Sequence, residues 1–93
     1  MPRFKVSHVR EQGIDLVIIP LESSFGNKLP DEQHQIMQEF QARSMAAGLA
    51  GAVVPVWPQG RSMAFIAPHN WHPFFHGLSL DSVLANVNKE LYW

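Results

Sequence analysis

Residues 14–21, Ile-Asp-Leu-Val-Ile-Ile-Pro-Leu, restrict the fold of this chain more than any other segment. The run is rich in β-branched residues, and both of its alternating sets of positions are apolar. As a strand it would therefore be apolar on both faces, which is typical of a central strand. The rest of the chain, or a second chain, must then cover this strand on each side.

A glycine-containing segment before this strand predicts a hairpin. Residues 4–9 alternate in character, and Arg10-Glu11-Gln12-Gly13 join them to the central strand. Gly13 can adopt the left-handed conformation that closes a three-residue loop with a bulge. We therefore expect residues 4–9 and 14–21 to be antiparallel neighbours.

A second hairpin is predicted around Pro58-Gln59-Gly60. Residues 52–57 and 62–67 are apolar segments on either side of this turn signal. Pro55 cannot donate a ladder hydrogen bond, which favours an edge or bulged position for the first of these two strands.

Two amphipathic helices complete the expected elements. The first begins at Pro30, whose fixed φ suits the first helical position, and ends before Gly48. A long loop, residues 68–79, precedes a second helix that is capped by Ser79. The apolar stripe of this second helix runs towards the C-terminus and consists of Leu80, Val83, Leu84, Val87 and Leu91.

This order of elements predicts one α+β domain over residues 1–93, with a four-stranded mixed or antiparallel sheet and both helices on one face. The two halves align when Gln12-Gly13 is laid on Gln59-Gly60, which leaves a ββα duplication with pseudo-twofold symmetry open. Helices on one face would leave the other face of the apolar strands bare. A second copy of the chain is the economical cover, so we expect a homodimer.

Charge and composition exclude several classes of protein. Seven Lys and Arg against eight Asp and Glu give a net charge of −1, so the cationic surface that nucleic acids require is missing. The absence of cysteine excludes disulfides and thiolate zinc sites, and no apolar run approaches the roughly 18 residues of a membrane span. The N-terminus has no secretory apolar region. We expect a cytoplasmic protein that binds neither nucleic acid nor membranes.

The densest group of candidate binding residues is His-Asn-Trp-His-Pro-Phe-Phe-His-Gly at residues 69–77. Large aromatic side chains dominate protein–protein hot spots, so this loop predicts a surface for a protein partner. The residues assigned to that surface are Trp57, Trp71, Phe74, Phe75 and Trp93. The alternative is that most of these side chains fill the core, and periodicity does not separate the two.

The same loop carries three histidines, His69, His72 and His76. Neutral imidazoles are good ligands for zinc, nickel or another divalent metal, so metal or small-ligand binding is an alternative function for this loop. The spacing matches no standard zinc pattern, and a fourth ligand would have to come from elsewhere. The leading expectation is therefore that the protein has no cofactor.

Residues 22–28, between the central strand and the first helix, are a candidate anion site. Ser24, Gly26 and Lys28 lie in this loop, where backbone N–H groups and a lysine could bind an anion. The loop lacks the glycine and lysine spacing of a P-loop. A solvated connection explains the same composition.

A catalytic site remains a further alternative. In the duplication arrangement, residues 22–28 and 68–79 lie at the same end of the sheet, and a cleft between them could hold a small hydrolase or transferase site. Such a site would pair Ser23 or Ser24 with one of the loop histidines. No motif fixes that geometry, so no catalytic residue is assigned. The leading prediction is a small non-enzymatic protein-interaction module.

Overall fold

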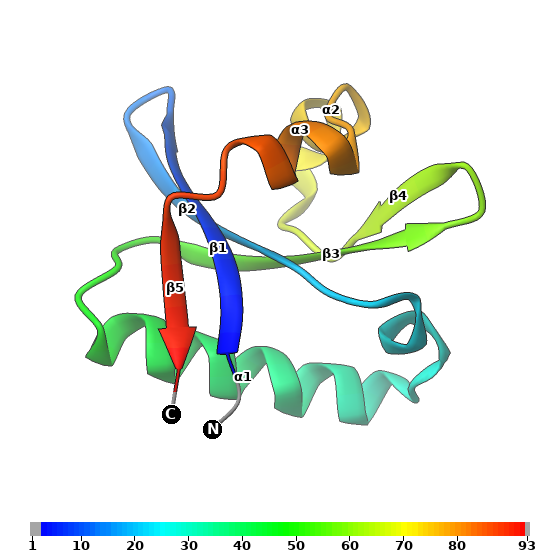
Figure 1. The fold of residues 1–93 in the computed structure, drawn as a ribbon, viewed down its shortest axis with the longest axis horizontal. Helices are drawn as coiled ribbons and strands as arrows, with labels where there is room; N and C mark the ends of the chain where they lie inside the picture. Colours follow the sequence, from blue (N-terminus) through cyan, green and yellow to red (C-terminus); the bar gives the residue numbers. More distant parts are fainter. Residues whose placement is uncertain (1–2, 93) are drawn as a thin grey trace.

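The computed structural model describes residues 3–92 and contains one mixed five-stranded sheet with the strand order β4-β3-β2-β1-β5 (Figure 1). The strands are β1 (Arg3–Glu11), β2 (Ile14–Pro20), β3 (Ala52–Gln59), β4 (Ser62–Phe65) and β5 (Lys89–Tyr92). The α-helices are α1 (Pro30–Ala46), α2 (His72–His76) and α3 (Leu80–Ala85), and the 3₁₀-helices are η1 (Ser23–Asn27) and η2 (His69–Trp71). The predicted α+β class and the mixed sheet are confirmed.

The apolar run that restricts the fold is β2, which lies in the middle of the sheet. It pairs with β1 in the antiparallel direction and with β3 in the parallel direction. Leu16 and Ile18 belong to the apolar cluster on one face, and Val17 and Ile19 belong to the cluster on the other face. All four side chains are buried, because elements cover the strand on both sides.

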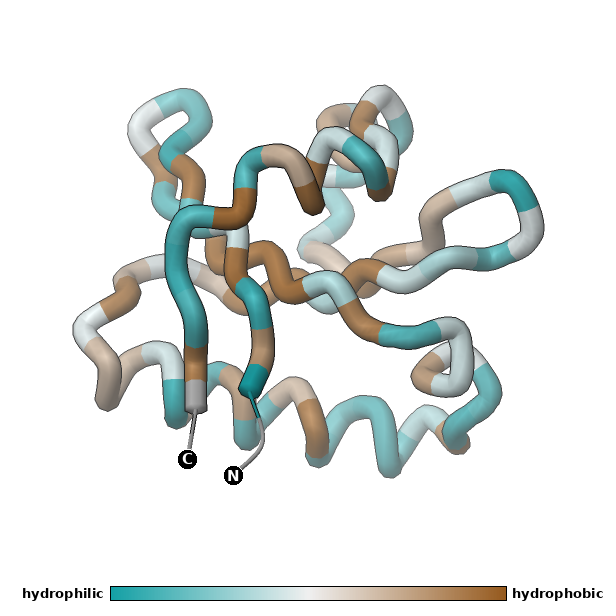
Figure 2. Tube along the Cα trace, viewed as in Figure 1, coloured by the Kyte–Doolittle hydropathy of each residue, from teal (hydrophilic) through white to brown (hydrophobic). Residues whose placement is uncertain are grey.

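The helices lie on opposite faces of the sheet, with α1 on one side and α2 and α3 on the other (Figures 1 and 2). Phe40 of α1 packs on the first face, whereas Phe75 of α2 and Val83 of α3 pack on the second. The prediction of both helices on one face is therefore wrong, because residues 66–85 fold back across the second face. No bare sheet face remains in the described chain to require a second copy as cover.

The first hairpin is tighter than the predicted three-residue loop. Glu11 pairs with Ile14, which leaves two residues in the turn. These residues, Gln12 and Gly13, have φ values of 52° and 77°. Two consecutive left-handed residues are the pattern of a type I′ turn, whose twist matches that of the flanking strands.

Pro55 lies in an internal strand, contrary to the predicted edge or bulge. The Ile66 N–H donates to the Pro55 carbonyl at 3.2 Å, so the polar groups of Pro55 face the β4 side. The missing N–H therefore removes no hydrogen bond between β2 and β3. A proline is tolerated here because its nitrogen faces a position just beyond Phe65, where β4 has ended.

The C-terminal segment is a short helix followed by a strand, whereas the sequence predicts one helix. The Ser79 cap is confirmed, since its Oγ accepts a hydrogen bond from the Ser82 N–H at 3.1 Å. The helix α3 ends at Ala85, and β5 then pairs with the first residues of β1 in the antiparallel direction. Val83 and Leu91, which the predicted stripe places on one helix face, pack on opposite faces of the sheet.

The two ββα halves are not related by a pseudo-twofold axis normal to the sheet, because such an axis would keep both helices on one face, whereas Phe40 of α1 and Val83 of α3 pack on opposite faces. Because β2 is parallel to β3 and β3 is antiparallel to β4, the strands β2 and β4 point in opposite directions. The segments that follow these two strands therefore leave opposite ends of the sheet and do not form the predicted shared cleft. Within residues 3–92, no helix combines the length and the apolar character that crossing a membrane requires.

Candidate functional site

A groove opens at one end of the sheet because β1 changes its pairing partner along its length. The segment Ser7–Glu11 pairs with β2, whereas Arg3–Val6 pair with β5 on the other edge of β1. The strand β2 continues along β3 as far as Pro20, so β1 and β2 diverge beyond Ser7 and Ile18 (Figure 1). We call the space between the diverging strands the fork groove.

Pro20 is suited to the strand end that borders this groove. The Leu21 N–H donates to the Val56 carbonyl at 2.7 Å, so the backbone of the preceding residue faces the β1 side. Proline has no N–H to leave without a partner there. The divergence of the two strands therefore leaves no backbone N–H group without a hydrogen-bond partner at this residue.

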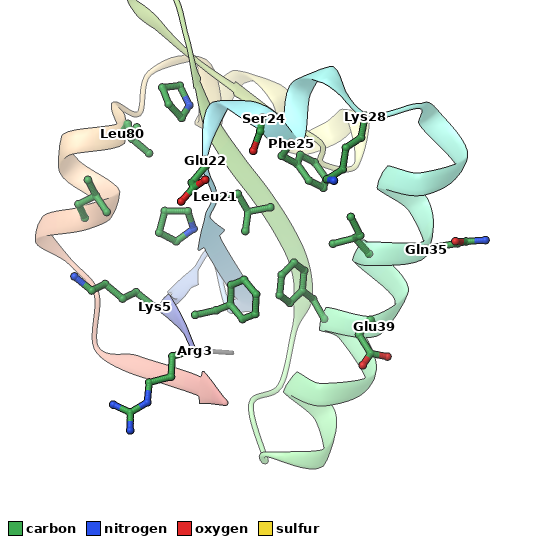
Figure 3. A pocket seen from close by; sticks show the side chains of 16 residues that line it. Arg3, Lys5, Leu21, Glu22, Ser24, Phe25, Lys28, Gln35, Glu39 and Leu80 are labelled. Carbon is green, nitrogen blue, oxygen red and sulfur yellow. The ribbon is translucent and has the colours of Figure 1, made fainter. Parts of the chain in front are cut away.

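The fork groove has a volume of about 950 Å³ and is bounded by α1, α3 and η1 (Figure 3). Most of its lining is apolar, and these lining residues are Phe4, Pro20, Leu21, Phe25, Ile36, Phe40, Pro58, Leu80 and Leu84. Phe4 and Phe40 stack edge to face with their ring centroids 4.7 Å apart. Leu84 is 47% exposed, so apolar surface at the groove faces solvent.

Five charged side chains border the fork groove, and two of them have ion-pair partners outside its lining. The Arg3 Nε lies 3.9 Å from a carboxylate oxygen of Glu90, and a carboxylate oxygen of Glu39 lies 3.1 Å from the Arg43 Nε. These four residues are solvent-accessible, so each pair contributes little to the free energy of folding. The charges of Arg3 and Glu39 are nevertheless partly balanced from outside the groove.

The other three charged residues of the groove are Lys5, Glu22 and Lys28, and none forms an ion pair with another residue between positions 3 and 92. Figure 3 shows Lys5 and Lys28 on opposite sides of the groove with Glu22 between them. Two ammonium groups and one carboxylate leave an excess of one positive charge. The groove therefore combines an apolar interior with a cationic excess at its border.

The predicted anion-site residues are only partly brought together. Ser24 and Lys28 both line the fork groove, but Gly26 lies against Trp57 instead. A Cβ added to Gly26 would lie 2.5 Å from the Trp57 Nε1, so this glycine allows η1 to approach the indole. The Phe25 and Lys28 N–H groups donate to carbonyls within the same segment, at 3.0 and 3.2 Å. These two backbone amides are therefore already engaged within the segment.

The aromatic residues assigned to a partner surface are mostly buried. The exposed fractions are 8% for Trp57, 7% for Trp71 and 1% for Phe75, and Phe74 is half-buried. Trp71 and Phe75 belong to the cluster on the second face of the sheet. This arrangement fits the alternative that they fill the core. Trp93 lies outside the described residues, and the partner surface stays a prediction.

The three loop histidines lie near one another without forming a metal centre. The ring centroids of His69 and His72 are 5.1 Å apart, and those of His72 and His76 are 6.2 Å apart. The His72 Nε2 lies 3.1 Å from the Ala67 carbonyl oxygen, and His72 and His76 both contact the Phe65 ring edge to face. Among the residues that the structure describes, no three His, Cys, Asp or Glu side chains are placed to hold a metal ion.

The serine and histidine residues of the catalytic alternative are not combined in one site. Ser24 lines the fork groove, and none of the described residues that line this groove is a histidine. His76 lines a different cavity of about 420 Å³, between the β3–β4 hairpin and the start of α3. A serine nucleophile needs a base within hydrogen-bond reach, which this arrangement does not supply.

Sequence reasoning missed most of the fork groove, including Lys5 and Leu84. One available signal in the sequence was Ile36, which continues the apolar stripe of the first helix on the N-terminal side of Phe40. In the structure the Ile36 side chain is only half-buried. Comparison of the chain with known protein families, with curated proteins and with solved structures finds no match. The fork groove is therefore the feature of this chain that bears most directly on its function.

Proposed function

We propose that this protein is a non-catalytic binding module and that the fork groove takes a small ligand with an apolar body and one anionic group. The observation that carries this proposal is the open apolar groove of about 950 Å³ between the diverging strands. Ligand sites in proteins measure about 300–1,000 Å³ and combine mostly apolar walls with a few polar groups. The fork groove has that size and that composition.

The apolar lining supplies the affinity for the ligand body. Side chains such as Phe25, Ile36 and Leu80 come from three different elements and line one continuous space. Removing apolar surface from water contributes about 25 cal/mol per Å², so a ligand body of modest size gains several kcal/mol here. The lining side chains belong to packed elements, so little ordering of the protein opposes binding.

The charges at the border favour an anionic group on the ligand. Lys5 and Lys28 have no ion-pair partner within residues 3–92, and Ser24 adds a hydroxyl on the same side of the groove as Lys28 (Figure 3). An anionic group that reaches either ammonium forms a charge-assisted hydrogen bond. Glu22 opposes a ligand with several negative charges, which favours a single anionic group.

Fluorescence titration with anilinonaphthalene sulfonate, an apolar anionic dye, tests this proposal on the full chain. Bound dye is then displaced with decanoate or with decanol, which share an apolar chain and differ in charge. We expect decanoate to compete about tenfold better than decanol, because only the carboxylate engages the lysines. Equal competition by the two compounds would remove the anionic group from the proposal.

Variants locate the site. Ile36→Trp fills the groove, and we expect the dye to bind at least about tenfold more weakly. Met45→Trp is the matched control, since Met45 lies on the same helix, is 68% exposed and does not line the groove. Lys28→Gln should weaken decanoate and leave decanol unchanged, whereas Lys89→Gln on β5 should alter neither. Unchanged dye binding in the folded Ile36→Trp protein would overturn the proposed site.

A further inference from the structure

The outer edge of β4 is a second candidate binding surface, and the residues of β4 do not line the fork groove. This strand is the last in the sheet order, so no strand of the described chain pairs with its outer side. Figure 1 shows the β3–β4 hairpin extending away from the body of the protein. An open strand edge carries backbone donors and acceptors that another strand can pair with.

The register of the hairpin identifies the groups on that open edge. Phe65 pairs with Val56 and Ala64 pairs with Trp57 in the antiparallel ladder. The hydrogen bond from the Ile66 N–H to the Pro55 carbonyl shows that Ile66 faces inward, towards β3. Antiparallel strands alternate between inward and outward backbone groups, so Ala64 also faces inward, and Met63 and Phe65 present their N–H and carbonyl groups outward.

The two edges of the sheet differ in charge. The edge strand β5 contains Lys89 and Glu90, and Glu90 lies within ion-pair distance of Arg3. Charged residues on an edge discourage pairing with another strand. The strand β4 reads Ser-Met-Ala-Phe and carries no charge. Only the β4 edge therefore lacks this protection.

We infer that β4 pairs with β4 of a second copy of this chain, in the antiparallel direction and about a twofold axis that passes beside Ala64. In this register, Met63 of one copy exchanges hydrogen bonds with Phe65 of the other, and the reverse pair forms at the same time. The same outward groups serve both copies, as a symmetric dimer requires. The two sheets then form one continuous sheet, and the β4 edges are no longer open.

The side chains agree with this pairing. Met63 and Phe65 pack on the cluster of the second face, so their side chains point away from the backbone edge and leave it accessible. Ala64 of one copy lies directly opposite Ala64 of the other copy across the axis. Residues directly opposite each other in such a pair have Cβ atoms about 4.5–5.5 Å apart. A small residue at this position lets the two strands approach without a clash.

Charge variants at the axis test the inference, with native mass spectrometry as the readout. The wild-type chain is expected at twice the mass of one copy. Because like charges directly opposite each other are destabilising, Ala64→Lys and Ala64→Glu are each expected to be monomeric. A mixture of the two variants is expected to recover a dimer that contains one of each, which also shows that both variants are folded. A monomeric wild-type chain, or a mixture that stays monomeric, would overturn the inference.

A cysteine variant gives an independent readout, because the chain has no cysteine of its own. In the inferred register, the Cα atoms of the two copies of residue 64 lie about 4.5 Å apart, within the range of a disulfide. Mild oxidation of Ala64→Cys is expected to give a covalent dimer. Ala46→Cys, at an exposed position on α1, is the control and should stay largely monomeric. Equal crosslinking of the two variants would contradict the inferred interface.

Discussion

The side chain of Asn88 forms two hydrogen bonds with the backbone of His8. Its Oδ1 accepts from the His8 N–H at 2.9 Å, and its Nδ2 donates to the His8 carbonyl at 2.9 Å. The Asn88 N–H also donates to the Val6 carbonyl at 3.0 Å. The side-chain amide thus extends the contact between these two segments to His8, two residues along β1 from Val6, where the pairing of β1 with β5 ends.

Asn88→Ala is expected to lower the free energy of unfolding by about 1–2 kcal/mol, because it removes both hydrogen bonds to His8 at a partly solvated position. Urea denaturation followed by circular dichroism measures this loss. Asn70→Ala is the control, since Asn70 is exposed and no side-chain hydrogen bond is seen for it in the described structure, and it should change the stability by less than about 0.5 kcal/mol. Equal effects of the two substitutions would contradict this role of Asn88.

A second amide side chain, Gln41 of α1, binds the backbone at the start of β3. Its Nε2 donates to the Gly51 carbonyl at 3.0 Å, and its Oε1 accepts from the Val53 N–H at 3.0 Å. Gln41→Glu keeps the size and the acceptor but places a carboxylate oxygen against the Gly51 carbonyl. We expect a loss of about 1–3 kcal/mol and faster hydrogen exchange at Val53. Gln38→Glu, an exposed change on the same helix, should leave both quantities nearly unchanged.

Substitutions at Gly51 and Gly60 distinguish two contributions to the free-energy cost of replacing a glycine, the backbone conformation and a steric clash. Both have positive φ, 119° and 60°, but a Cβ on Gly51 would lie 2.4 Å from the Asp15 carbonyl oxygen, whereas a Cβ on Gly60 meets nothing within 4 Å. We expect Gly60→Ala to cost about 1–2 kcal/mol for the backbone conformation alone. Gly51→Ala should cost clearly more, since the backbone of β2 must also move. Thermal denaturation that ranks the two variants in the reverse order would refute this account.

Ser44 of α1 is fully buried, and its hydroxyl has no hydrogen-bond partner among the described residues. Ser44→Ala removes this unsatisfied group and introduces the residue with the highest helix propensity. We expect the melting temperature to rise by several degrees, which corresponds to about 0.5–2 kcal/mol for a chain of this size. A melting temperature that falls would mean that the hydroxyl is satisfied in solution.

Local sequence patterns were sufficient for the elements that depend on neighbouring residues. The apolar run at Leu16–Ile19 and the turn glycine at Gly13 predict the first hairpin, and Pro30 and Gly48 mark the limits of the first helix. Gly48 has a φ of 80°, as expected for a residue that ends a helix. These features follow from periodicity and from backbone preferences, which act over a few residues.

The C-terminal strand could not be predicted in the same way. Lys89–Tyr92 pair with Arg3–Val6, more than 80 positions away along the chain, and no local pattern reports such a partner. The spacing of Leu80, Val83, Val87 and Leu91 also fits a helix, because short apolar runs do not distinguish helix from strand. Leu80 and Val83 pack on one face of the sheet and Leu91 packs on the other, which only the three-dimensional structure shows.

The fork groove escaped prediction for the same reason. It exists because β1 leaves β2 to pair with β5, so its position depends on that long-range pairing. The candidate residues Ser24 and Lys28 were identified from the composition of one loop, and both do line the groove. Phe4 and Leu84 come from opposite ends of the chain, and their shared position became apparent only in the folded protein.

The pairing of β1 with β5 also bears on when the groove forms during folding. Pairing β1 with β5 closes a loop of nearly the whole chain. The conformational entropy lost in this closure must be offset before the contacts between the two strands stabilise the fold, so contacts of such separation form late. The hairpin β1–β2 and the unit β2-α1-β3 involve closer residues and are therefore available to form first. The fork groove then forms only after β1 and β5 have paired, and fragments that lack either of these strands are expected to lack the groove.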